Sequence, residues 1–296
     1  MEMKQQRSSK EAMSFDLESC ELSSSSCSIE DKLPSTNNLI RGKDGQYAVG
    51  RKLAQGRYGA VLRKSDGKPF ACKLEVCSSN SHGLDMDYVV MSQVAKRGCN
   101  NLLSSIDRGK IEDHFKFIIM PLLGDNLTKI RHQFVDGRLS LSSGLRLAFL
   151  ALSPIQELHS IGFVHRDIKC SNFCLAPHSS KGNTRLVLID YGVCRAYKDK
   201  SGNLKPPREQ VRFRGTTRYA SLNTHNGLEQ SPRDDLESWF YMMLHWVLQV
   251  EFRRVQKYLD GLTFQGQPDY TFIAEMVQLA MKNNGVKMDE PYDWEE

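Results

Sequence analysis

The stretch H-R-D-I-K-C-S-N, from His165 to Asn172, places a carboxylate, an ammonium group and an amide close together along the chain. Transfer of a phosphoryl group needs a carboxylate near the attacking hydroxyl and oxygen ligands for the metal ion that bridges the phosphates. Asp167 can supply the carboxylate, Asn172 can supply one metal ligand, and Lys169 can neutralise the moving charge. The spacing predicts a catalytic loop, and the structural alternative is an aspartate in an ordinary turn.

A second motif, I-D-Y-G from Ile189 to Gly192, ends the apolar run Leu186–Ile189. Asp190 is therefore expected at the end of a strand, where a magnesium-binding carboxylate belongs. Tyr191 stands where phenylalanine is usual. The two motifs together, in this order, are far more specific than either alone, and they predict magnesium ligands at Asn172 and Asp190.

Upstream, Lys73 in A-C-K-L-E shares one face of a predicted strand with Ala71. This geometry lets the alanine cover an adenine ring while the ammonium group reaches phosphates. A strand lysine is more often a solvated charge, but its place before both motifs favours the nucleotide role.

The segment A-Q-G-R-Y-G-A-V, Ala54 to Val61, is typical of a hairpin that covers phosphates, because glycines let backbone N–H groups approach closely. Ala54 replaces the first glycine of the usual pattern, so a slightly stiffened loop is expected. The predicted nucleotide contacts in this loop are Ala54, Gly56, Gly59 and Val61.

Apolar periodicity divides the chain into a strand-rich part and a helix-rich part. The predicted strands are Tyr47–Leu53, Tyr58–Lys64, Phe70–Val76 and Phe115–Met120, with one helix, Leu84–Lys96, among them. The helices predicted after Gly124 are Leu141–Ile155, Trp239–Val250, which is apolar nearly all round, and Tyr270–Lys282. This order of elements indicates an α+β fold with two lobes.

Residues 1–44 are rich in Ser, Glu and Lys and poor in aromatic residues. Such a segment buries too little apolar surface to offset its ordering entropy, so a disordered tail is expected there. It could carry phosphorylation sites or be idle. The folded domain is expected over residues 45–296, with the lobes meeting between residues 123 and 124.

Composition narrows the class of protein. The net charge of +5 is mild and does not by itself indicate nucleic acid. The longest apolar stretches are much shorter than the roughly 20 residues that cross a bilayer, so no membrane partner is expected. The eight cysteines include no C-x-x-C pair and are expected to be reduced. We expect a monomer in the cytoplasm, with the nucleus as an alternative.

The segment Arg212–His225 reads R-F-R-G-T-T-R-Y-A-S-L-N-T-H and carries Ser221-Leu222-Asn223 where A-P-E is common. In this feature the chain resembles the casein kinase 1 group of protein kinases. K-P-P-R at Lys205–Arg208, R-D-D-L-E-S at Arg233–Ser238 and P-Y-D-W-E at Pro291–Glu295 are similar to its tau-tubulin kinase branch. The resemblance runs from about residue 45 to the end.

The resemblance implies a bilobal protein kinase fold and a serine/threonine protein kinase. Asp167 would orient the substrate hydroxyl or accept its proton, and Lys169 and Thr216 would steady that carboxylate. Asp235 would hold the backbone of the catalytic loop from a buried helix. The substrates would be proteins with serine or threonine acceptors.

The resemblance also implies ATP and Mg²⁺ as cofactors. Asn172 and Asp190 would hold magnesium, and Lys73 would hold the phosphates. Met120 would be the gatekeeper before a hinge in which the N–H of Leu123 faces adenine.

Two departures leave catalytic competence open. The helix position that pairs with the strand lysine in the family falls on Asp87, which is one methylene shorter than glutamate. Either the helix moves inward, or the Lys73 pair is long or bridged by water. The second departure is Glu251–Gln267, which is short for the family, so we expect a helix to be missing from the larger lobe. A weakly active kinase or pseudokinase that acts as a binding module is the alternative.

The activation segment, here residues Arg195–Arg218, is strongly basic, and its acidic residues are Asp199 and Glu209. Its cationic residues are Arg195, Lys198, Lys200, Lys205, Arg208, Arg212, Arg214 and Arg218. We expect Arg212 and Arg214 to bind substrate and to favour acidic or phosphorylated side chains. A solvated basic loop is the alternative, and nucleic acid is not expected because no aromatic residues alternate with the charges.

Overall fold

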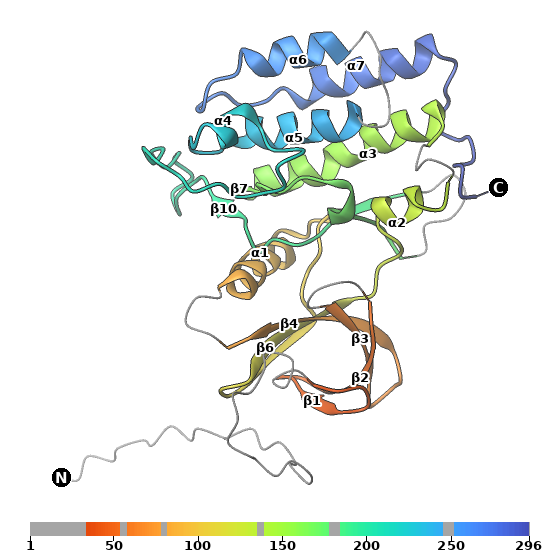
Figure 1. Ribbon diagram of the computed structural model, residues 1–296, viewed down its shortest axis with the longest axis vertical. Coiled ribbons are helices and arrows are strands. Elements are labelled where there is room, and N and C mark those ends of the chain that lie inside the picture. The colour runs from red at the N-terminus through yellow and green to blue at the C-terminus, as the bar shows by residue number, and fades with distance from the viewer. Residues whose placement is uncertain are drawn as a thin grey trace. The chain divides into compact units, whose positions relative to one another are not determined.

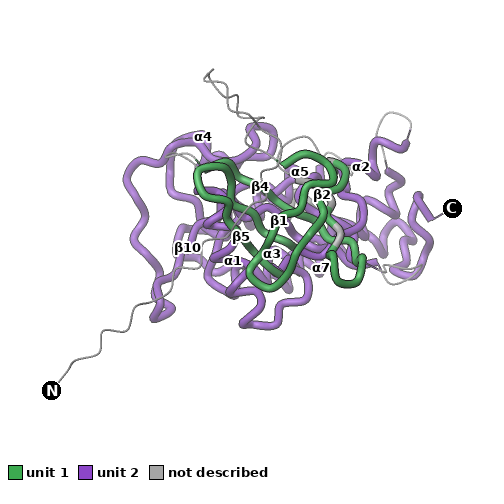
Figure 2. Tube along the Cα trace, turned by 90° about the horizontal axis from the view of Figure 1, so that it is seen from below, with its two compact units in different colours: residues 1–81, 106–119 green, residues 82–105, 120–296 purple. Residues whose placement is uncertain are grey.

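The computed structural model describes residues 34–53, 58–77, 82–134, 139–177, 184–244 and 252–295. They fall into two compact units, drawn in Figures 1 and 2. Unit 1 consists of residues up to 81 together with 106–119, and unit 2 of residues 82–105 and 120 onward. No helix in the described ranges is long and apolar enough to cross a membrane. Unit 1 contains the large sheet and unit 2 contains the helices, so the predicted α+β fold is confirmed.

Unit 1 is built on a six-stranded sheet with the strand order β1-β2-β3-β4-β6-β5. The strands are β1 (Leu39–Arg41), β2 (Gln46–Lys52), β3 (Tyr58–Arg63), β4 (Pro69–Val76), β5 (Asp107–Ile111) and β6 (Phe115–Pro121). The strands predicted from alternation are β2, β3, β4 and β6, each within one or two residues of its observed ends. Strands β1 and β5 were not predicted from the sequence.

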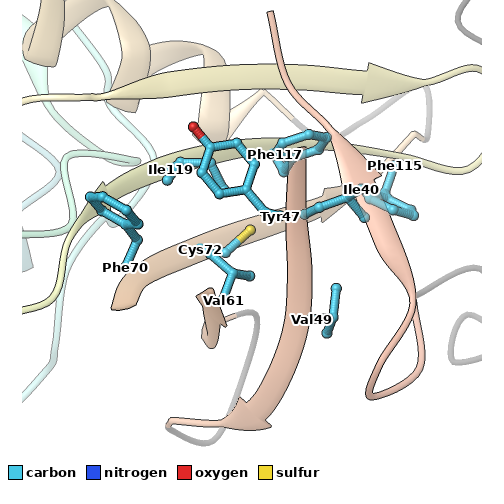
Figure 3. Close-up of a cluster of buried hydrophobic side chains, with 9 residues drawn as sticks. All are labelled: Ile40, Tyr47, Val49, Val61, Phe70, Cys72, Phe115, Phe117 and Ile119. Atoms are coloured by element: carbon cyan, nitrogen blue, oxygen red, sulfur yellow. The ribbon is translucent and has the colours of Figure 1, made fainter. Parts of the chain in front are cut away.

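Alternation along these strands buries one face of the sheet. The buried cluster consists of Ile40, Tyr47, Val49, Val61, Phe70, Cys72, Phe115, Phe117 and Ile119 (Figure 3). In β4, Phe70 and Cys72 are buried in this cluster. Because successive side chains point to opposite faces, Ala71 and Lys73 share the other face, as predicted.

The folded part of the chain begins earlier than expected. Strand β1 lies inside the segment 1–44 that was predicted to be disordered, and its residue Ile40 is only 1% exposed. Residues 1–33 lie outside the described ranges. A three-residue strand is too short to give a periodic signal, so only its pairing with β2 reveals it.

The turn between β1 and β2 is fixed by Asp107 at the start of β5. Its carboxylate accepts the N–H of Lys43 at 2.9 Å and the hydroxyl of Tyr47 at 2.9 Å. Burial and this carboxylate together raise the pKa of Tyr47 to about 12. A Cβ at Gly42 would lie 2.2 Å from Asp107 Oδ2, so the carboxylate can enter the turn only beside a glycine.

Unit 2 is arranged around one long helix, α3. Its helices are α1 (Gly83–Arg97), α2 (Leu127–Arg131), α3 (Leu141–Ser160), α4 (Leu222–His225), α5 (Pro232–Leu244), α6 (Phe252–Asp260) and α7 (Tyr270–Asn283). Helix α3 packs against α5 and α7, and α6 packs against both of these (Figure 1). The apolar face predicted for α3 is buried, including Leu145, Ala148, Leu152 and Ile155.

The region after α5 differs from its prediction. Helix α5 begins at Pro232, seven residues before the predicted Trp239, and residues 245–251 lie outside the described ranges. The stretch 251–267, which was expected to lack a helix, contains α6. Helix α6 is short and strongly charged, and its contacts with α5 and α7 stabilise it more than its own sequence does.

Helix α1 belongs to unit 2 and not to the strand-rich unit in which it was expected. Hydrogen bonds explain this grouping. Asn101, just after α1, donates its backbone N–H to Glu157 of α3 at 2.9 Å. Leu102 forms a bridge with Leu188, and the N–H of Leu103 is bound by the hydroxyl of Tyr191.

Candidate active site

The catalytic loop follows strand β7 (Phe163–Val164), and Asp235 of α5 holds its backbone. Asp235 Oδ2 accepts the N–H of His165 at 2.6 Å, and Oδ1 accepts the N–H of Arg166 at 2.8 Å. Arg166 has φ 68°, a left-handed conformation that a non-glycine residue keeps only when its surroundings fix it. The contact expected of Asp235 is therefore present.

Asp235 is 1% exposed, and its carboxylate has hydrogen-bond partners within unit 2. His159 Nε2 lies 2.8 Å from Oδ2. Burial raises the pKa of Asp235, but the hydrogen bond with His159 and the backbone N–H of His165 outweigh burial and hold the pKa below its ordinary value. The other ring nitrogen of His159 contacts the hydroxyl of Tyr270 on α7. His159 and Tyr270 were not predicted from the sequence, because only the folded chain brings them to Asp235 and the catalytic loop.

His165 connects the catalytic loop to the loop that carries Asp190. Its Nδ1 accepts the N–H of Asp167 at 3.2 Å, and its Nε2 lies 3.1 Å from the carbonyl oxygen of Ile189. Both contacts are satisfied by the tautomer with the proton on Nε2. The imidazole also meets the ring of Tyr191 edge-on. His165 thus fixes the spacing between the two catalytic motifs.

The carboxylate of Asp167 lies between a lysine and a threonine. Lys169 Nζ is 2.7 Å from Asp167 Oδ2 and donates to Thr216 Oγ1 at 3.0 Å. The hydroxyl of Thr216 donates to Asp167 Oδ1 at 2.6 Å. Thr216 reaches this position because Gly215 has φ 120° and passes so close to Arg166 that a Cβ would lie 2.4 Å from its carbonyl oxygen. Only glycine allows this approach.

Asn172 and Asp190 lie at the same end of a small hairpin. Strand β8 (Phe173–Leu175) pairs antiparallel with β9 (Leu186–Leu188). Asn172 immediately precedes β8 and Asp190 follows β9, so both come to one end. The N–H of Ile189 donates to the Asn172 carbonyl at 2.9 Å, which closes that end. Asp190 itself has φ 67°, a second left-handed residue in the site.

The amide of Asn172 is oriented by its own hydrogen bond. Its Nδ2 donates to the carbonyl oxygen of Asp167 at 2.8 Å, which directs the amide oxygen away from that contact. An amide oxygen and a carboxylate are ligands of the kind that Mg²⁺ prefers. Among the described residues, no three His, Cys, Asp or Glu side chains cluster as a metal site. A magnesium ion here would therefore depend on Asn172, Asp190, phosphate oxygens and water.

The remaining predicted site residues are distributed as follows. In unit 1, Gly59 and Val61 lie on β3, and Ala71 and Lys73 on β4, whereas Ala54 and Gly56 fall outside the described ranges. In unit 2, Met120 is buried and Leu123 is half-buried. Asp87 is fully buried on α1, and Arg212 and Arg214 are exposed. The expected pairing of Lys73 with Asp87 stays a prediction.

The basic activation segment is less uniform than its sequence suggests. Arg208 and Arg195 both bind the carboxylate of Glu229, at 2.6 and 3.3 Å. These two cations are thus paired with a carboxylate of the protein, and the side chain of Arg208 is still 44% exposed. Glu229 was not predicted as a partner of these arginines, because no motif or periodicity around a single glutamate after α4 indicates its contacts.

A carboxylate held by a lysine and a threonine, in the same loop as an asparagine that could bind magnesium together with Asp190, is the arrangement that phosphoryl transfer needs. Residues 47–235 match the family described as "Protein kinase domain". This range covers more than half of the chain, so the chain belongs to the protein kinase family.

Two relatives carry names of the serine/threonine class. A Dictyostelium discoideum protein named "Probable serine/threonine-protein kinase" is 29% identical over 291 residues, covering 87% of this chain and 57% of that protein. "Serine/threonine-protein kinase spe-6" from Caenorhabditis elegans is 25% identical over 296 residues, covering 86% of this chain and 77% of that protein. The chain thus spans little more than half the length of the first relative.

Proposed function

We propose that this protein is a serine/threonine protein kinase that transfers the γ-phosphate of ATP to hydroxyl groups of proteins. The observation that carries this proposal is the placement of Asp167 against Lys169 and Thr216. A substrate hydroxyl near Asp167 would give up its proton to the carboxylate as its oxygen forms the new bond to the γ-phosphorus, while the bond from that phosphorus to the bridging oxygen breaks and ADP leaves. Lys169 would balance the charge that develops on the transferred group.

ATP and Mg²⁺ are used by protein kinases in general, and the residues of this chain fit both. A bound magnesium ion would neutralise the charge of the phosphates during transfer. Asn172 and Asp190 supply the oxygen ligands, and the left-handed backbone of Asp190 presents its carboxylate at the hairpin end. Lys73 on β4 is assigned to the phosphates by its place in the family pattern.

For the substrate we propose proteins with acidic or phosphorylated residues near the acceptor, and for the subfamily the casein kinase 1 group near its tau-tubulin kinase branch. Two features support this. Arg212 and Arg214 are exposed a few residues before Thr216. Ser221 caps helix α4 by accepting the N–H of Thr224, so Ser221-Leu222-Asn223 has a defined structural role in place of A-P-E. A cytoplasmic monomer remains part of the proposal.

Transfer of radiolabelled phosphate from ATP to acidic and neutral peptides tests this function, with Asp167→Asn as the matched variant. We expect transfer to serine or threonine that requires magnesium and is lost in Asp167→Asn, while the melting temperature changes little. Transfer near the wild-type rate in Asp167→Asn would refute the assigned role.

Thermal melting with and without magnesium-ATP separates binding from catalysis. A ligand at 100 times its dissociation constant adds about 2.7 kcal/mol of stability, so a clear upward shift is expected. A shift without any transfer would support the alternative, a weak kinase or pseudokinase that acts as a binding module. If magnesium-ATP causes no melting shift and no phosphate is transferred, both readings are refuted.

A further inference from the structure

Glu229 is a buried carboxylate that no catalytic step uses. It lies in the loop between α4 and α5, and its side chain is 3% exposed. Arg208 binds it with both ends of the guanidinium group, Nε at 2.6 Å from Oε2 and Nη2 at 3.0 Å from Oε1. Arg195 Nε lies 3.3 Å from the same Oε2. A buried charge needs such partners, and the paired geometry of Arg208 is the strongest form available to it.

The charges around Glu229 keep it ionised. Burial raises the pKa of Glu229, but the hydrogen bond from Arg208 and the charges of Arg195 and Arg208 outweigh burial and leave the pKa below its ordinary value. At neutral pH the loop therefore holds a full negative charge between two cations.

Of the two arginines, Arg195 connects this charge to the catalytic loop. Arg195 lies on strand β10 (Arg195–Ala196) and pairs with Val164 of β7, the strand that leads directly into His165. Arg166 belongs to the same cluster, since its Nε donates to the carbonyl of Val193 at 2.6 Å. Burial lowers the pKa of Arg166, and the negative charge of Glu229 acts in the opposite direction.

The same loop also anchors the stretch that leads to Thr216. The N–H of Val211 donates to the carbonyl of Gly227 at 2.9 Å. Gln230 Nε2 donates to the carbonyl of Arg214 at 3.3 Å. The loop between α4 and α5 therefore holds the activation segment by hydrogen bonds from Gly227 and Gln230, on either side of Glu229.

We propose that Glu229 is a positioning residue that fixes the activation segment and so keeps Thr216 against Asp167. In other protein kinases a phosphate added to the activation segment does this by pairing with arginines. Here a carboxylate supplied by the chain itself pairs with Arg208 and Arg195. The inference rests on the proposed kinase function.

The first test compares Glu229→Gln with the control Glu209→Gln. Glu209 is exposed and follows Arg208 in the sequence. We expect the Michaelis constant for a peptide substrate to rise by about fivefold or more in Glu229→Gln only, while that for ATP stays within about twofold. Wild-type activity should not change after phosphatase treatment. Wild-type peptide kinetics in Glu229→Gln, or loss of wild-type activity after phosphatase treatment, would overturn the proposal.

Limited trypsin digestion gives a measurement that does not depend on activity. Trypsin cuts after Arg208, Arg212 and Arg214, and we expect these cuts to be faster in Glu229→Gln than in Glu209→Gln or wild type. If wild type transfers no phosphate, the proposed function fails, but this digestion still decides whether Glu229 holds the segment. Equal digestion of all three proteins would show that it does not.

Rescue by a small carboxylate separates positioning from general destabilisation. In Glu229→Ala, acetate should enter the vacated space between the two arginines and restore part of the peptide activity, and it should have no effect on Glu209→Ala. If Glu229→Ala does not fold, Arg208→Gln replaces it and should raise the peptide Michaelis constant as Glu229→Gln does. No rescue of folded Glu229→Ala, or unchanged kinetics in Arg208→Gln, would contradict the positioning role.

Discussion

Asp87 Oδ1 accepts a hydrogen bond from the backbone N–H of Tyr191 at 2.8 Å. The bond joins helix α1 directly to the I-D-Y-G motif inside unit 2. Asp87 has no exposed surface, and a Cβ added to Gly192 would lie at an ordinary contact distance of 3.5 Å from Asp87 Oδ2. The short side chain of aspartate thus matches the distance between α1 and this loop, which answers part of the question raised by the missing glutamate.

We expect Asp87→Glu to lower the free energy of unfolding by about 1–3 kcal/mol, because an extra methylene overpacks a site with no exposed surface. It should not raise turnover. Urea unfolding and initial rates measure both quantities, and Asp85→Glu, at an exposed position of the same helix, is the control. Higher turnover with unchanged stability would instead indicate a loosely held Lys73.

Tyr191→Phe should destabilise the protein although it restores the residue that is usual in this motif. The hydroxyl of Tyr191 is fully buried, donates to the Leu188 carbonyl at 2.6 Å and accepts the N–H of Leu103 at 2.7 Å. Its removal leaves a buried N–H without a partner, which costs about 1–3 kcal/mol.

Urea unfolding of Tyr191→Phe should therefore show a lower midpoint with an unchanged slope. Tyr219→Phe, at a partly exposed tyrosine of the same unit, is the control and should change stability by no more than about 0.5 kcal/mol. Equal stability of both variants would show that the hydroxyl of Tyr191 is not needed.

Arg146→Ala should release the P-Y-D-W-E segment from α3. Arg146 is fully buried, donates to the carbonyls of Glu290 and Pro291, and lies with its guanidinium carbon 3.8 Å from the centre of the Tyr292 ring. We expect a loss of about 3 kcal/mol, because two carbonyls lose a charged donor and a cation–π contact is lost.

Chemical denaturation measures the effect of Arg146→Ala, and Arg254→Ala on exposed α6 surface is the control. Hydrogen exchange of residues 286–295 should rise only in Arg146→Ala. Unchanged exchange there would mean that other contacts, such as those of Asp293 with Ser140, hold the segment alone.

Replacing Arg212 and Arg214 together with alanine should weaken the recognition of acidic peptides. Two exposed charges contribute about 1 kcal/mol together, which is about fivefold in the Michaelis constant, and the salt dependence should fall. Neutral peptides should be unaffected. Lys282→Ala with Lys287→Ala removes the same charge elsewhere and serves as the control. If the Michaelis constants for acidic and neutral peptides change equally, the basic segment is only a solvated loop and does not recognise acidic substrates.

The sequence predicted elements well where periodicity was long enough to read. Strands β2, β3, β4 and β6 and helix α1 follow directly from apolar spacing. Strand β5, with the sequence D-R-G-K-I, has too many polar residues for such a signal and exists because it pairs with β6. Helix α6 depends in the same way on α5 and α7.

For the site, the sequence by itself determined which chemical groups are present and which of them stand together: Asp167, Lys169 and Asn172 in one loop, and Asp190 at the end of a strand. Local backbone geometry sets such spacings, so a motif carries them. Only the tertiary structure showed that His159 joins Asp235 to Tyr270 and that Glu229 binds both Arg208 and Arg195. The physical reason is that a buried charge is stable only beside its partners, and the fold of the whole intervening chain selects those partners.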